Sequence, residues 1–104
     1  METSNTEGKS MSKGRPVLVT TKHRGVFFGY LNGDHSKESL VLRGARNCIY
    51  WDKPCGGFLG LASKGPVGES RVGERCDELE LYDITSIAKV TAEAVKLWES
   101  KLCS

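Results

Sequence analysis

Two stretches decide the fold: VFFGYL at residues 26–31 and LVLRGARNCIYW at residues 40–51. Both are rich in β-branched and aromatic residues, which is typical of strands. Between them, Asn32-Gly33-Asp34 has turn chemistry, because asparagine and glycine tolerate the positive φ that a tight turn needs. The pattern predicts two neighbouring strands joined by a polar connection.

The longer stretch changes its phase of hydrophobic alternation at Gly44. The apolar residues before the change are Leu40 and Leu42, and those after it are Ala45, Ile49 and Trp51. One extra residue at Gly44, a β-bulge, would turn both sets toward the core and bend the strand. The side chains then expected to face outward are Arg43, Arg46, Cys48 and Tyr50.

Three further strands and one helix complete the expected fold. The strands are predicted at residues 17–21, 78–82 and 83–90. Thr91 is a good N-cap for a helix over residues 92–102, whose apolar stripe of Val95, Trp98 and Leu102 should pack on the sheet. The fold class is mainly β: a small, five-stranded, strongly bent antiparallel barrel with a C-terminal α-helix.

The chain of 104 residues has the length of one domain. Residues 1–15 are expected to be a disordered polar tail, and residues 16–104 the barrel domain. The segment 52–77 holds six of the 12 glycines and two of the three prolines, which predicts a mobile, glycine-rich loop with a short strand at Phe58–Leu61.

The composition predicts a protein that stays in the cytoplasm and away from membranes. No apolar run approaches the roughly 20 residues of a membrane helix, and the first residues lack the apolar stretch of a secretory signal. The four cysteines include no C-x-x-C pair, which favours free thiols. A zinc site that adds His23 and His35 is the alternative.

Positive charge is concentrated in the first half of the chain. Residues 1–46 contain eight Lys/Arg and four Asp/Glu, whereas the whole chain has a net charge of only +2. A basic first half is compatible with an anionic partner, although an ordinary solvated surface has a similar composition.

The stretch from Gly25 to Leu31, followed by Asp34, Leu40–Leu42 and Ala45, resembles the first motif of Sm-like proteins. The second motif of that family carries an RNA-contacting arginine and glycine, and residues 79–90 contain no such pair. The resemblance therefore implies an Sm-like or SH3-like barrel without its RNA-binding residues. It also implies a homo-oligomer, because joining the open edge strands of such barrels removes unpaired backbone groups.

The chain is also similar to small uncharacterised bacteriophage proteins. The segments that carry this resemblance are RPVLVTT (15–21), RGVFFGYL (24–31), ARNCIYW (45–51) and GFLGLA (57–62). It implies an accessory protein in the cytoplasm of a bacterial host. Phage proteins of this size often sequester or block host components, including nucleotide signals made by immune systems.

A patch of aromatic and arginine side chains is the first candidate site. If Phe27 and Leu31 face inward, alternation places Phe28 and Tyr30 outward. Arg43, Arg46 and Tyr50 are expected on the same outer face. Aromatic rings stack on bases and arginines hold phosphates, so the patch suits a nucleotide or a single strand. A subunit interface has the same composition.

The glycine-rich segment is the second candidate site. It lacks the Gly-Lys-Ser order of a phosphate loop, which excludes a nucleotide triphosphatase. Looser anion binding by its basic residues, or a solvated loop, remain as alternatives. The complete set of predicted ligand-binding residues is Phe28, Tyr30, Arg43, Arg46, Tyr50, Lys64, Arg71 and Arg75.

No residue pattern supports catalysis. Cys48 or Cys55 with His23 lacks a third residue, and the acids at 77–83 suit the solvent face of a strand. The sequence predicts a non-enzymatic, cofactor-free homo-oligomer that captures an anionic, nucleotide-type small molecule in pockets between protomers. The alternatives are a ring that binds single-stranded RNA or DNA, and a protein–protein adaptor or inhibitor of a host enzyme.

Overall fold

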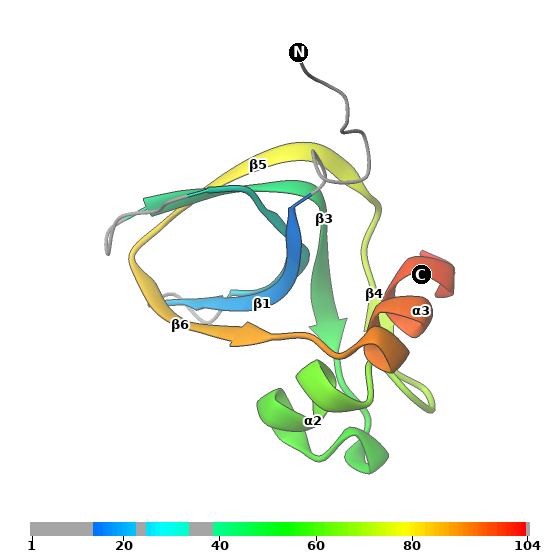
Figure 1. Cartoon of the computed structure of the whole chain (residues 1–104). Coiled ribbons are helices and arrows are strands. Elements are labelled where there is room, and N and C mark those ends of the chain that lie inside the picture. The colour runs from blue at the N-terminus through cyan, green and yellow to red at the C-terminus, as the bar shows by residue number, and fades with distance from the viewer. Residues whose placement is uncertain (1–13, 23–24, 34–38, 104) are drawn as a thin grey trace.

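The computed structural model describes residues 14–22, 25–33 and 39–103. Within these residues the chain forms strands β1 (Arg15–Thr21), β2 (Val26–Leu31), β3 (Ser39–Tyr50), β4 (Arg71–Val72), β5 (Cys76–Tyr82) and β6 (Ile84–Lys89), together with a 3-10 turn η1 (Lys53–Cys55) and helices α2 (Gly57–Ser63) and α3 (Ala92–Ser100). Figure 1 shows the strands curving around an interior, with α2 and α3 outside the curve.

The strands form one antiparallel sheet. β1 lies between β2 and β6, and β2 lies between β1 and β3. On its other side, β3 pairs with β5 along its first half and with the short β4 at its end. The mainly β architecture with a C-terminal helix is confirmed. The sheet is not closed, and it has six strands instead of the five expected, because β4 adds a two-residue strand.

The β-bulge predicted at Gly44 is present. Phe28 pairs with Arg46 and Tyr30 pairs with Arg43, so two steps along β2 face three steps along β3. Gly44 takes up the extra residue with a φ of +57°. Glycine adopts this left-handed conformation without the steric cost that a Cβ would impose.

One hydrophobic cluster fills the inside of the curved sheet. It contains Val17, Val19, Leu31, Leu40, Leu42, Ala45 and Leu81. The inward directions predicted for the leucines of β3 and β5 and for Ala45 are therefore confirmed. Phe27 packs against the edge of this cluster, as its place in the alternation predicts.

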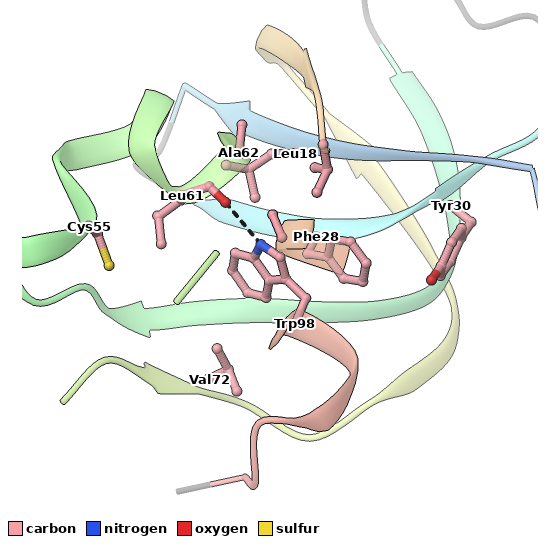
Figure 2. Packing of buried hydrophobic residues seen from close by; sticks show 10 residues of the cluster. Leu18, Phe28, Tyr30, Cys55, Leu61, Ala62, Val72 and Trp98 are labelled. Carbon is pink, nitrogen blue, oxygen red and sulfur yellow. Dashed lines mark hydrogen bonds between the residues drawn. The ribbon is translucent and has the colours of Figure 1, made fainter. Parts of the chain in front are cut away.

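A second hydrophobic cluster lies between the outer face of the sheet and the two helices (Figure 2). The Trp98 ring stacks on the Phe28 ring with 5.1 Å between centroids and 4° between planes. Its Nε1 donates to the Leu61 carbonyl at 3.1 Å. The helices therefore cover a face that the sequence predicted to be open.

This cover corrects the predicted exposure of three candidate site residues. Phe28, Tyr30 and Arg46 are 0%, 6% and 5% exposed, respectively. The two aromatic side chains do point away from the inner cluster, as alternation requires, but α2 and α3 pack over them. The prediction of an open patch of rings and guanidinium groups at these positions is wrong.

The far end of β3 also differs from the prediction. Ile49 and Trp51 were expected in the core, yet they are 47% and 38% exposed. The pairing with β2 ends at Phe27 and Asn47, so β3 continues past its neighbour and this part of the inner face is left uncovered. Cys48, expected outside, is half-buried and packs against the outer cluster.

The glycine-rich segment contains regular structure. Residues 58–61, predicted as a strand, lie in α2. The helix packs closely against the preceding turn, since a Cβ at Gly60 would lie 1.4 Å from the Cys55 carbonyl oxygen. Asp52 fixes both ends of the segment by accepting from the backbone N–H groups of Lys53 and Glu69, each at 2.9 Å.

The C-terminal helix begins as predicted but is shorter than expected. Thr91 caps α3 by accepting from the Ala94 N–H at 3.1 Å, as predicted, but the helix ends at Ser100. The expected tail lies outside the described residues up to residue 13, as do His23 and His35. All four cysteines are free. Across the described part of the chain, no helix is long and apolar enough to span a membrane.

Two residues of the predicted apolar stripe, Trp98 in α3 and Leu102 beyond its end, make a matched test of this packing, since the prediction that Leu102 packs on the sheet is wrong. Trp98→Ala should reduce the free energy of unfolding by about 3–5 kcal/mol, because it removes a fully buried indole and leaves a cavity against Phe28. Leu102→Ala, at a side chain that is 85% exposed, should change it by less than about 0.5 kcal/mol. Urea unfolding followed by circular dichroism measures both, and equal effects would contradict the packing described.

Candidate functional site

A pocket of about 260 Å³ lies over the bulge in β3. Its lining residues come from β2, β3, the β4–β5 connection and the end of α3: Tyr30, Arg43, Gly44, Arg75 and Glu99. Three of the eight predicted ligand-binding residues, Tyr30, Arg43 and Arg75, therefore come together. Apart from the adjacent Arg43 and Gly44, the residues that meet here are distant in the sequence, and sheet pairing and the docking of α3 bring them together.

Glu99 links two walls of the pocket. One carboxylate oxygen accepts from the Tyr30 hydroxyl, and the other forms an ion pair with the Arg75 guanidinium. Burial, and then the hydrogen bond to Glu99, raise the pKa of Tyr30 above its ordinary value. The phenol therefore remains a hydrogen-bond donor at neutral pH, and it helps to fix the position of the Glu99 carboxylate.

Gly44 lies at the base of the pocket. The Arg75 Nη1 donates to the Gly44 carbonyl at 3.4 Å. A Cβ at residue 44 would lie 3.5 Å from that nitrogen and 3.7 Å from the Tyr30 ring, and it would also be strained at the observed φ. Gly44 thus allows the bend of the strand, and it adds no side chain to the pocket above the bulge.

Arg43 supplies a cation at the rim of the pocket. It is exposed on β3, opposite Glu78 of β5 in the strand register. Among the residues that the structure describes, no hydrogen bond or ion pair engages its guanidinium. Since Arg75 is already paired with Glu99, Arg43 is the guanidinium available to an incoming anion.

Arg46 has a different role from the predicted one. Its Nε donates to the Gly73 carbonyl at 3.0 Å and its Nη1 to the Trp98 carbonyl at 2.7 Å. The Trp98 carbonyl belongs to the last turn of α3, where carbonyl groups lack helical partners. Burial lowers the pKa of Arg46, and the nearby charge of Arg75 adds to this effect. Arg46 is buried, and its hydrogen bonds link β3 to the β4–β5 connection and to α3.

The other predicted residues lie elsewhere. Tyr50 and Arg71 are exposed and face each other across β3 and β4. Lys64, at the end of α2, donates to the Pro54 carbonyl at 3.3 Å. Phe28 belongs to the second hydrophobic cluster, between the sheet and the helices. The structure thus divides the predicted set among the pocket, the core, the end of β3 and α2.

Sequence reasoning missed Glu99 and the pocket-forming role of Gly44. A signal for Glu99 did exist, because it lies beside the apolar stripe in the last turn of the predicted helix. A carboxylate is mildly disfavoured there by the helix dipole, and a cationic partner from another element would offset this effect. The position of that partner could not be read from the sequence.

Two of the four cysteines are buried or half-buried. Burial raises the pKa of Cys48 to about 11, so its thiol stays protonated at neutral pH. Cys55 is buried and bonds to the Gly65 carbonyl at 3.6 Å and to the Ser70 hydroxyl at 3.1 Å. In residues 14–22, 25–33 and 39–103, no cluster of histidine, cysteine and acidic side chains could hold a metal ion.

The fold and the pocket define a small antiparallel β-sheet protein with a C-terminal helix and an arginine-lined pocket at a strand bulge. Residues 14–98 match the family model described as a domain of unknown function, DUF6948, and the chain belongs to that family. The matched range includes Tyr30, Arg43, Gly44 and Arg75, and it ends one residue before Glu99. No curated protein matches the chain.

The two arginines of β3 provide a test of these different roles. Arg46→Leu should reduce the free energy of unfolding by about 2–4 kcal/mol, because the carbonyl groups of Gly73 and Trp98 lose their donor. Arg43→Leu should change it by less than about 0.5 kcal/mol, since the side chain is exposed. Denaturant unfolding measures both, and an unaffected Arg46→Leu protein would exclude the structural role.

Proposed function

We propose that this protein is a non-enzymatic binding protein that captures a small, anionic, nucleotide-type ligand in the pocket over the β3 bulge. The observation that carries the proposal is the Arg43 guanidinium, which has no partner among the described residues and lies at the rim of a pocket that also contains Arg75. Guanidinium groups bind phosphate and carboxylate oxygens through paired N–H donors, which gives both affinity and orientation.

The size of the pocket limits what one protomer can enclose. At about 260 Å³ it is smaller than the roughly 300–1,000 Å³ typical of small-molecule sites, so it suits one part of a nucleotide. A second protomer could enclose the rest. β5 pairs only with β3 and β6 only with β1 among the described strands, which leaves two edges available. Joining such edges would give a homo-oligomer of Sm-like barrels.

The resemblance to small bacteriophage proteins suggests where such capture would matter. In an infected cell, a binding protein could withdraw a nucleotide signal made by a host immune system. Retention of the intact molecule would suffice, and a catalytic group would not be needed. Native mass spectrometry of freshly purified protein reports the subunit count and any retained ligand together.

A nucleotide panel tests the proposal directly. At least one nucleotide should raise the melting temperature and bind in calorimetry, because a ligand that binds only the native state stabilises it. Arg43→Gln should weaken that binding about tenfold or more, since it removes a charge-assisted contact. Arg15→Gln, an exposed strand arginine outside the pocket, is the matched control and should bind like the wild type. A panel without any binding nucleotide would refute the proposal.

Single-stranded nucleic acid is a second candidate ligand, favoured by a different surface. Tyr50 is 50% exposed, and Arg71 lies opposite it across β3 and β4. Trp51 is the next residue and is also partly exposed. Exposed rings beside an arginine suit base stacking and phosphate contact, which together bind single strands with little sequence preference.

This second candidate predicts binding that depends on Tyr50 and on salt. Tyr50→Ala should weaken binding of a fluorescent single-stranded oligonucleotide by about 1–3 kcal/mol, and affinity should fall steeply as ionic strength rises. Tyr82→Ala, at another exposed tyrosine far along the chain, serves as the control. Fluorescence anisotropy measures these effects, and equal losses in both variants would argue against a stacking site.

A further inference from the structure

The side chains that line the pocket carry a net positive charge. Two guanidinium groups and one carboxylate line it, which gives a formal net charge of +1. The ion pair with Glu99 already compensates Arg75. The remaining positive charge is that of Arg43.

The Glu99 carboxylate is a fixed part of the site. The Tyr30 hydroxyl and the Arg75 guanidinium bond to different carboxylate oxygens, from different elements. The side chains of Arg75 and Glu99 are 39% and 29% exposed, so both border the space that a ligand would enter. An anion bound at Arg43 would therefore lie close to the negative charge of the Glu99 carboxylate, whose position these two bonds fix.

From this balance we infer that the pocket selects a singly charged oxyanion, such as a phosphodiester or a carboxylate, over a doubly charged terminal phosphate. One negative charge neutralises the pocket, whereas a second would face Glu99, and the described residues that line the pocket include no third guanidinium to compensate it. A phosphodiester and a carboxylate both present an oxyanion that accepts two parallel N–H bonds from one guanidinium. The inference rests on the proposed function of this pocket and adds the class of ligand.

Three adenosine compounds separate the effect of charge from that of base and sugar. Adenosine 3′,5′-cyclic monophosphate carries one negative charge, adenosine 5′-monophosphate carries about two at pH 8, because its second pKa is about 6, and adenosine carries none. The wild type should bind the cyclic compound about five- to tenfold more tightly than the 5′-monophosphate in calorimetry at low salt. Adenosine should bind more weakly than the cyclic compound.

Variants of Glu99 test the cause of this preference. Glu99→Gln leaves an amide of similar size and removes the negative charge, so it should improve binding of the 5′-monophosphate relative to the cyclic compound by about five- to tenfold. Glu99→Asp retains the charge and should retain the preference. Arg15→Gln is the control outside the pocket, and thermal unfolding of each variant confirms that it is folded.

The possible results distinguish this inference from the proposed function. Equal or tighter binding of the 5′-monophosphate by the wild type, or an unchanged ratio in folded Glu99→Gln, would overturn the inference and leave the pocket as a binding site. Absence of binding by benzoate, by these three compounds and by every other nucleotide of the panel would overturn both. A comparison of benzoate with the cyclic compound identifies the source, since either a carboxylate or a phosphodiester supports a singly charged oxyanion.

Discussion

The contact between Trp98 and Phe28 is the interaction on which the other features of this protein depend. It places α3 on the outer face of the sheet, where the indole also bonds to the Leu61 carbonyl of α2. The same docking brings the end of α3 to the buried Arg46 and places Glu99 beside Arg75. A helix whose first role is to complete a hydrophobic core thereby supplies one wall of the candidate pocket.

The bulge at Gly44 has a comparable double effect. It turns Leu42 and Ala45 toward the same inner cluster, and it leaves Arg43 and Arg46 on the same outer face. The two arginines nevertheless have opposite environments, since α3 covers one and stops short of the other. Their difference in exposure comes from the cover above the strand rather than from the direction of the side chain.

This distinction explains how far the sequence could predict the structure. Alternation and turn chemistry act locally, and they correctly predicted the main strands, the bulge and the Thr91 cap. They could not predict which parts of the outer face the helices cover, because that depends on contacts between distant residues. The same limit applies to α2, whose glycine-rich sequence has low intrinsic helix propensity and whose packing needs Gly60 against Cys55. Of the pocket, three arginine and tyrosine positions were predicted, but Glu99 was not.

Glu99 also shows why the fold and the charge of the pocket are not separable. A carboxylate in the last turn of a helix is destabilised by the helix dipole, and its partners here come from β2 and from the β4–β5 connection. Arg75 also donates to the Gly44 carbonyl at the bulge. Any change that shifted α3 would therefore alter the hydrophobic core and the charge of the pocket together. The selectivity of such a site would be set by the same tertiary contacts that stabilise the domain.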